Sequence, residues 1–180
     1  MLFLWKLLRC FVVWRMRPDM SRFKEAQVII GYGFGDYGNQ AMANLIRKLV
    51  QYHHYSLPLA LQWDIAQYLP DDMEKLIVVE RHRELGVDGN PLYLDTEEVS
   101  AQVANKCLPQ GLKKAIIVAH PDHYRRCVWN AQAHGFEVMG VLDTSWVPYG
   151  PATGWASKNR FWFTVREILA RLVYLSRGWV

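Results

Sequence analysis

Cysteine is scarce in this sequence, and its three copies, Cys10, Cys107 and Cys127, stand far apart. They form no C-x-x-C pair and include an odd one, so the sequence indicates neither a disulfide framework nor a cysteine zinc site. A reducing compartment is the simplest setting for them. We therefore expect the protein in the cytoplasm or on the cytoplasmic face of the inner membrane.

Long uncharged apolar runs are also missing. The most apolar segment, residues 1–16, contains three basic residues and falls short of the ~20 apolar residues that a transmembrane helix needs. No small-residue cleavage site follows it, as a secretory signal peptide would require. Two interpretations of residues 1–25 stay open. They form a basic helix at a membrane interface, with Trp5 and Trp14 near the headgroups, or a helix packed on the domain itself.

Acidic residues are scarce at both ends of the chain. Residues 1–25 carry six Lys or Arg against two acids, and residues 158–180 carry five against one. The middle has ten basic residues against fourteen acidic ones. This distribution argues against a broad nucleic-acid-binding face on the central domain, and no nucleic-acid partner is expected. It favours attraction of the two ends to an anionic membrane surface.

Motifs for covalent catalysis are absent as well, since the sequence has no G-x-S-x-G elbow and no recognisable cysteine nucleophile motif. What the 180 residues do contain is apolar material for one domain, because 51% of them are hydrophobic. Short apolar runs alternate with helical stretches, which is typical of an α/β fold, a Rossmann-like three-layer sandwich with a mainly parallel sheet. We expect strands at residues 27–31, 57–63, 75–80, 114–120 and 136–142, a weaker strand at 92–94, and helices at 39–52, 96–108, 122–134 and 159–176.

Local signals support several of these boundaries. Asp95 is placed to cap the helix at 96–108, with Glu98 closing a capping box. Gly111 and Gly135 each follow a predicted helix, where glycine is favoured.

The segment after the first predicted strand is the most informative motif, because Gly31, Gly33, Gly35, Asp36 and Gly38 fall within eight residues. The last three glycines match G-x-G-x-x-G, whose missing side chains let backbone N–H groups approach a phosphate or carboxylate at the start of the next helix. The same glycines also suit a flexible turn without a ligand. We predict a loop that binds a small anionic or nucleotide-like ligand, because a strand and a helix flank it as that mechanism requires.

A second cluster, His120, Asp122, His123 and Arg126, follows the strand at 114–120. His123 and Arg126 are three residues apart, so in a helix they face the same way. As catalytic residues they would serve as a proton carrier and a clamp for phosphate or carboxylate. In the structural alternative, Asp122 caps the helix, His123 bonds locally and the arginines are solvated. No metal site is expected, because a third firm ligand at a matching spacing is missing.

The carboxyl ends of parallel strands meet at one edge of a sheet, so the glycine loop and the His120 turn are expected to share a crevice. Asp64 lies roughly where a dinucleotide-binding domain places its ribose-binding acid, although 31 residues separate it from Gly33, more than the usual ~20. It binds ribose there or caps a short helix beginning at Ile65. In the amphipathic tail, Arg166 and Glu167 form an outward ion pair or reach into the crevice.

The order of these motifs resembles the YdcF-like family, which includes the SanA and ElyC envelope proteins. Residues 116–127 look like the family's strand and its Tyr-His-x-x-Arg-Ala-like helix start, with His123 and Arg126 on the family's His and Arg positions. Residues 135–138 resemble a strand entry of the family, and residues 166–170 resemble its terminal Arg-Glu helix.

The resemblance covers about residues 26–175 and is strongest over 114–171. It implies a YdcF-like Rossmann-like domain at 26–180, a nucleotide-type ligand such as S-adenosylmethionine, and a link to bacterial envelope biogenesis. Its reaction is largely undefined. The sequence departs from the family where Trp63 and Asp64 replace a Gly-Gly pair and where aromatic residues enter the glycine loop. These departures predict an altered ligand pocket.

Three functions are weighed on these grounds. The first is a YdcF-like ligand-binding protein; if it is an enzyme, His123 and Arg126 suit group transfer or phosphate-ester chemistry better than redox chemistry. The second is a non-catalytic envelope-associated interaction or regulatory protein. The third is a nicotinamide-dependent oxidoreductase, which rests on the glycine pattern and Asp64 alone.

Overall fold

The protein folds around a parallel β-sheet. The computed structural model describes residues 7–8, 10–11, 17–53, 57–150 and 159–178. In this part of the chain, five strands pair in the order β3-β2-β1-β4-β5, and each pair is parallel. The strands are β1 (Val28–Gly31), β2 (Leu59–Gln62), β3 (Ile77–Val79), β4 (Lys114–Val118) and β5 (Glu137–Val141). The Rossmann-like α/β fold expected from the sequence is therefore confirmed.

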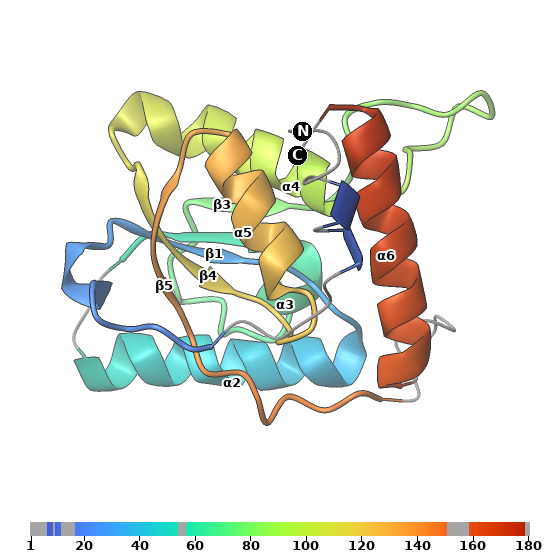
Figure 1. The fold of residues 1–180 in the computed structure, drawn as a ribbon. Coiled ribbons are helices and arrows are strands. Elements are labelled where there is room, and N and C mark those ends of the chain that lie inside the picture. The colour runs from blue at the N-terminus through green and yellow to red at the C-terminus, as the bar shows by residue number, and fades with distance from the viewer. Residues whose placement is uncertain (1–6, 9, 12–16, 54–56, 151–158, 179–180) are drawn as a thin grey trace.

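Helices cover both faces of the sheet (Figure 1). On one face, α2 (Asp36–His53) and the short α3 (Trp63–Ala66) pack on Ile29, Ile116 and Val118. On the other face, α4 (Thr96–Cys107) and α5 (Tyr124–Ala133) pack on Val28, Ile30 and Ile117. Because side chains alternate between the faces of a strand, a strand buried on both sides must be apolar throughout. The last helix, α6 (Arg160–Ser176), crosses the carboxyl ends of the strands and does not lie in either layer (Figure 1).

The five main strands lie where the sequence predicts them, but the prediction of a weaker strand at 92–94 is wrong. Residues 92–94 have no regular structure. The chain makes only an isolated bridge between Leu85 and Pro91, and the Leu92 N–H donates to the Glu84 carbonyl at 3.0 Å. Pro91 has no N–H to offer a ladder, and residues 92–94 pair with no strand, so an apolar run alone makes no strand here.

Two helices begin at other residues than predicted. α2 starts at Asp36, three residues before Asn39, because the Asn39 N–H donates to the Gly35 carbonyl at 2.8 Å and extends the helix through Gly38. α5 starts at Tyr124, two residues after Asp122. The intervening residues form a turn in which the N–H groups of His123 and Tyr124 both donate to the His120 carbonyl.

The helix-end predictions hold in most details. Asp95 is the N-cap of α4, and its Oδ1 accepts from the Glu98 N–H at 2.9 Å. The capping box does not close, since the Glu98 carboxylate instead pairs with Arg83 at 2.7 Å. Gly111 and Gly135 adopt φ angles of 78° and 94°, the left-handed region in which glycine carries no Cβ penalty.

The beginning of the chain packs on the domain where it is described. Residues 7–8 and 10–11 are helical, and the buried Cys10 donates from Sγ to the Arg171 carbonyl of α6 at 3.7 Å. Trp5 and Trp14 lie outside the described residues. Asp19 pairs with Val141 at the edge of β5. Within the described residues, no helix has the length and apolarity needed to cross a membrane.

Candidate functional site

The sheet reverses its direction of growth between β1 and β4, which are neighbours although β2 and β3 lie between them in sequence. In open α/β sheets this switch point, at the carboxyl ends of the strands, is where ligands bind. The loop after β1 contains the glycine motif, and the loop after β4 contains His120, Asp122 and His123. The fold therefore brings the two loops to one edge.

The backbone of the glycine loop is held by side-chain amides of the protein itself. The Gly33 N–H donates to Gln62 Oε1 at 2.8 Å, and the Phe34 N–H donates to Asn39 Oδ1 at 2.7 Å. Gly35 has a φ of 119°, which an L side chain rarely adopts. Sequence analysis missed Gln62 and Asn39 as partners of the loop. Two N–H groups of the kind that bind phosphate in such loops are thus already paired.

The other glycines of the motif serve close packing. A Cβ on Gly31 would lie 2.7 Å from Leu61 Cδ2, inside the sheet. A Cβ on Gly38 would lie 3.0 Å from Phe34 Cδ1. Asp36 is the first residue of α2, and its side chain lies outside the described residues. Of the predicted loop residues, Gly31 is therefore set back in the sheet, and Gly33 adjoins β2 through Gln62.

Asp64 lies directly beside Gly33 despite the 31 residues between them. A Cβ on Gly33 would stand 2.9 Å from Asp64 Oδ2, and Gln62 Nε2 donates to the same oxygen. The alternative role as a helix cap is wrong, because Gln62 is the N-cap of α3 and makes no side-chain capping bond. Asp64 therefore sits past the end of β2, next to the glycine loop, where a ribose-binding acid would be needed.

An aromatic cluster fills the space between the loops after β1 and β4. The Phe34 and His120 rings stack with centroids 3.5 Å apart and planes 5° apart. Tyr149 and Phe163 pack around them, with centroids 4.6 and 6.0 Å from that of His120. The His120 turn thus meets the glycine loop as expected, but through stacked rings, and His120 is fully buried.

Asp122 lies next to this aromatic cluster and is buried with it. It is 3% exposed, its Oδ2 accepts from the Tyr149 hydroxyl, and Arg160 Nε lies 3.5 Å from its Oδ1. It does not cap α5, whose N-cap is His123 with no side-chain capping bond. Asp122 therefore ties the loop at Tyr149 and the start of α6 to the end of β4.

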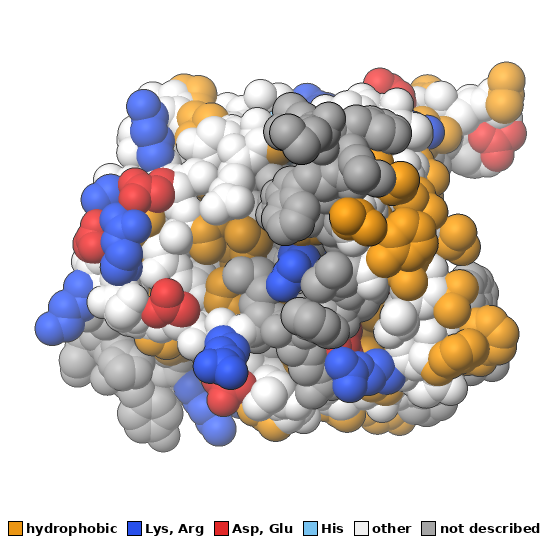
Figure 2. Space-filling model, in the orientation of Figure 1, with side chains coloured by type: hydrophobic (Ala, Val, Ile, Leu, Met, Phe, Trp, Pro, Cys, Tyr) orange, Lys and Arg blue, Asp and Glu red, His pale blue; other side chains and the backbone are white. Residues whose placement is uncertain are grey.

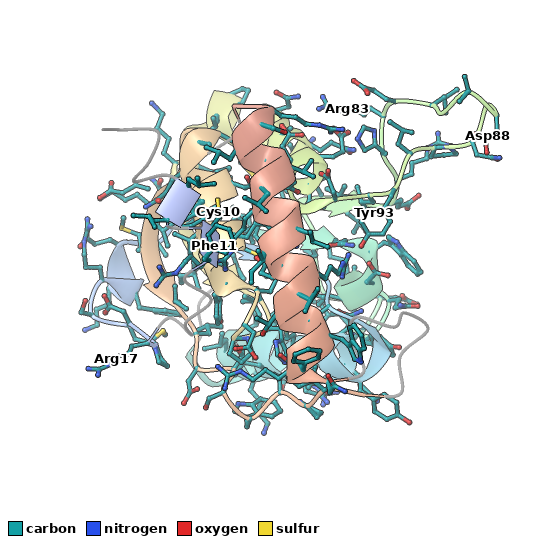
Figure 3. The ribbon with its side chains drawn as sticks, turned by 45° about the vertical axis from the view of Figure 1, so that its right-hand side comes forward. Cys10, Phe11, Arg17, Arg83, Asp88 and Tyr93 are labelled. Carbon is teal, nitrogen blue, oxygen red and sulfur yellow. The ribbon has the colours of Figure 1, made fainter. Side chains whose placement is uncertain are left out.

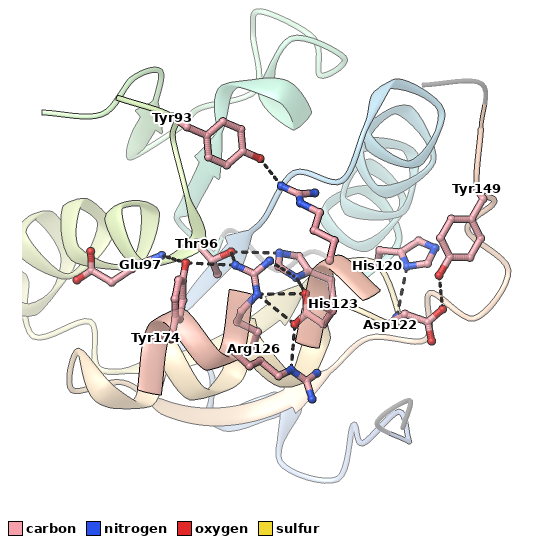
Figure 4. Close-up of polar contacts among 12 residues, drawn as sticks. Tyr93, Thr96, Glu97, His120, Asp122, His123, Arg126, Tyr149 and Tyr174 are labelled. Atoms are coloured by element: carbon pink, nitrogen blue, oxygen red, sulfur yellow. Dashed lines mark hydrogen bonds and ion pairs between the residues drawn. The ribbon is translucent and has the colours of Figure 1, made fainter. Parts of the chain in front are cut away.

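His123 and Arg126 lie in a separate buried cluster between α4, α5 and α6 (Figure 4). Arg126 Nε donates to both oxygens of Glu167, at 3.1 and 3.2 Å. Its Nη1 donates to Thr96 Oγ1 and to the Tyr174 hydroxyl, at 2.9 and 3.2 Å. Arg171 Nε reaches the same carboxylate at 3.2 Å. Arg126 is only 5% exposed, so the alternative in which it is solvated is wrong.

The electrostatics of this cluster keep His123 neutral. Burial, reinforced by the neighbouring Arg126 charge, lowers the pKa of His123 to about 4. Two groups face His123 Nδ1, the donor Arg126 Nη2 at 3.3 Å and the acceptor Glu167 Oε2 at 3.5 Å, so the geometry is compatible with either tautomer of the neutral ring. Burial would raise the pKa of Glu167, but Arg126, His123 and Arg171 together hold it well below its usual range. The cluster is a buried carboxylate between two guanidinium groups.

Arg166 and Glu167 point in different directions, so the predicted outward ion pair is wrong, and only Glu167 turns inward, to Arg126 and His123. Arg166 Nη2 donates to the exposed Tyr93 hydroxyl at 2.7 Å, while Glu167 is fully buried. Successive helical residues are turned by about 100°, so α6 carries one charge outward and the other inward. Sequence analysis also missed Thr96, Arg171 and Tyr174, whose roles depend on how α6 packs.

Two sets of candidate residues thus stand apart, separated by Phe163, whose ring centroid is 6.0 Å from those of both His120 and His123. Among the residues that the structure describes, no three His, Cys, Asp or Glu side chains are grouped as a metal site would need. Comparisons of the chain with family models, curated proteins and solved structures found no match. The YdcF-like resemblance therefore stays a prediction based on its motifs.

Proposed function

We propose that this protein binds a nucleoside-type ligand, with S-adenosylmethionine as the leading candidate, at the carboxyl ends of β1 and β2. The observation that carries the proposal is the contact between Gly33 and Asp64, whose Oδ2 would lie 2.9 Å from a Cβ on that glycine. A carboxylate beside a glycine loop offers acceptors to the two hydroxyls of a ribose. The resemblance to the YdcF-like family points to the same class of ligand.

The pairing of the loop N–H groups favours a nucleoside over a dinucleotide. In a nicotinamide-binding domain, the pyrophosphate lies on the glycine loop and takes its backbone N–H groups. Here Gln62 and Asn39 accept from Gly33 and Phe34, so a pyrophosphate would have to displace both side chains. S-adenosylmethionine has no phosphate, so it can bind without displacing these two side chains. The oxidoreductase hypothesis is accordingly the weaker one.

An exposed aromatic residue in the chain beside the site suits a purine base. Trp63, which directly precedes Asp64, is 42% exposed. Stacking of a base on an aromatic ring contributes ~1–3 kcal/mol to binding. The role proposed for His123 and Arg126 as catalytic residues stays a prediction, and the ligand site proposed here does not depend on it.

Calorimetric titration of the full chain with S-adenosylmethionine, adenosine triphosphate, nicotinamide dinucleotides and sugar phosphates tests this function. We expect heat of binding from S-adenosylmethionine and a weaker response, or none, from the dinucleotides. A preference for the dinucleotides would reverse the order of the hypotheses. If the folded protein binds none of these compounds, the interaction or regulatory role becomes the better hypothesis.

Substituting Gly33→Ala should weaken binding about tenfold while leaving the fold intact. The added methyl would stand 2.9 Å from Asp64 Oδ2 and 3.1 Å from Gln62 Cδ, so both side chains must move away from the loop. The Asp64 oxygen and the Gln62 amide can rotate away, but Asp64 Cβ, at 3.1 Å from the methyl, is fixed to the backbone, so a moderate loss of stability accompanies the change. The dissociation constant for S-adenosylmethionine, measured beside the thermal midpoint, separates the two effects.

Gly86→Ala is the matched control for this change. Its methyl would also meet an aspartate oxygen at 2.9 Å, that of Asp88, but in the exposed loop after β3. It should leave the affinity unchanged. Equal affinity of the Gly33→Ala protein and the wild type would remove the glycine loop from the site.

A further inference from the structure

The outer face of α6 is unusually apolar for a surface helix. Its buried face combines Glu167 and Arg171, which are 0% and 1% exposed, with two buried aromatic rings. Its outer face carries large apolar side chains, with Trp162 46%, Leu169 55% and Val173 46% exposed. A surface helix of a globular domain normally turns its apolar stripe inward and its charges to water. Exposed apolar groups that gather on one face indicate an interaction surface.

These side chains form one continuous stripe, which we call the α6 stripe: Trp162, Arg166, Leu169, Val173 and Arg177. Its members are spaced by three or four residues, so they lie above one another on the same side of the helix. Apolar side chains gather over α6 at the right of the space-filling view (Figure 2). The stripe is therefore an ordered surface of apolar and basic groups.

Neighbouring residues extend the stripe on both sides. Tyr93, 74% exposed, holds the Arg166 guanidinium at 5.8 Å from its ring centroid. On the opposite side, Cys10 contacts the backbone of α6, and beside it Leu8 and Phe11 are 53% and 55% exposed (Figure 3). The surface thus combines tryptophan, tyrosine and aliphatic groups, the side chains that favour a membrane interface.

The charge of the α6 stripe distinguishes between two candidate partners, a second copy of the chain and a lipid bilayer. Each charged residue in the stripe is an arginine, and Glu167, which stands alone as an acid in α6, is buried away from it. A second copy of the chain packed stripe to stripe would offer the arginines no acidic partner, because the stripe contains none, so this pairing gains no charge complementarity. Anionic lipid headgroups complement the arginines, and the bilayer boundary takes up the apolar groups between them.

We infer that the α6 stripe docks the protein on the surface of an anionic lipid bilayer. The helix lies flat on the membrane, with Trp162, Leu169 and Val173 among the headgroups and the arginines against lipid phosphates. The site at the ends of β1 and β2 plays no part in this contact, so the inference stands independently of the proposed ligand. It also differs from attachment through Trp5 and Trp14, since it assigns the contact to α6.

Sedimentation of the full chain with vesicles tests this inference. One vesicle population is phosphatidylcholine alone, and the other contains roughly a third of phosphatidylglycerol. Binding should require the anionic lipid and should weaken when salt rises from about 0.1 to about 0.5 M, because the headgroup charges are then screened.

The double substitution Leu169→Gln and Val173→Gln should lower binding at least about tenfold, since it removes the apolar part of the stripe. Val87→Gln is the control, because Val87 is fully exposed but lies in the loop after β3, beside Asp88. It should bind like the wild type. Far-UV circular dichroism of each protein establishes that these exposed changes leave the fold unchanged.

Three results would overturn the inference. The first is that the wild type fails to bind anionic vesicles. The second is that the double variant binds them as well as the wild type does. The third is a dimer in sedimentation equilibrium that the double substitution dissociates, which would assign the surface to a second copy of this chain.

Discussion

Replacing Glu167 by glutamine is expected to destabilise the fold by about 3–5 kcal/mol, which is typical for removal of one partner from a buried ion pair. Glu167 is fully buried and balances the two buried guanidinium groups of Arg126 and Arg171, at 3.1 and 3.2 Å. Glutamine has nearly the same volume, so the loss comes from charge and not from a cavity. Urea denaturation at neutral pH measures it.

Glu97→Gln is the control for this substitution. The Glu97 carboxylate also pairs with a basic group, His134, at 3.1 Å, but both side chains are partly exposed to water. A partly exposed polar contact of this kind contributes ~0–1 kcal/mol. If the two variants lost the same stability, the buried cluster would have no special role in holding α6 to the domain.

Acidification is expected to destabilise the protein first through His123. Burial and Arg126 lower the pKa of His123 to about 4, against its ordinary 6.5, so below pH 6.5 the unfolded chain takes up a proton that the folded protein does not. Stability is therefore complete above pH 6.5 and falls as the pH drops towards 4, by about 3 kcal/mol. Below about pH 4.5, Glu167 adds to the loss, because its pKa is held low in the folded state.

The free energy of unfolding, measured between pH 7 and 4, should fall with decreasing pH. His123→Gln should remove the fall between pH 6.5 and 4.5. Glutamine cannot titrate, and its amide offers groups that can replace the ring nitrogens facing Thr96 and Arg126. The same substitution at His82, in the loop after β3, should leave the slope in place. A slope that persists in His123→Gln would mean that another group causes the acid sensitivity.

The strands could be predicted because each is short, apolar and bounded by turn residues. A strand buried on both faces needs apolar side chains throughout, and runs such as residues 114–120 meet this condition without reference to the rest of the chain. The run at 92–94 has the same local appearance. It fails because it has no neighbouring strand, which a local pattern does not reveal.

The candidate site could be predicted only where sequence and fold topology suffice. The glycine loop and Asp64 follow neighbouring strands, so their proximity can be anticipated from a parallel sheet. The burial of His123 and Arg126 cannot be anticipated in this way. It depends on Glu167, which lies 41 residues after Arg126 on a helix that crosses the strand ends. Histidine and arginine at a strand end suggest a ligand, and the packing of α6 gives both side chains protein partners in this structure. Their catalytic role stays a prediction.

The affinity of the full chain for S-adenosylmethionine, compared between the wild type and Asp64→Asn, tests the ligand site most directly. Asparagine keeps the size of the side chain but replaces one hydroxyl-accepting oxygen by an amide and removes the charge. We expect binding to weaken at least about tenfold, the equivalent of ~1.4 kcal/mol, while the exposed control Asp71→Asn binds like the wild type. Equal affinities of Asp64→Asn and the wild type, or no binding by the folded wild type, would contradict a nucleoside site beside Gly33.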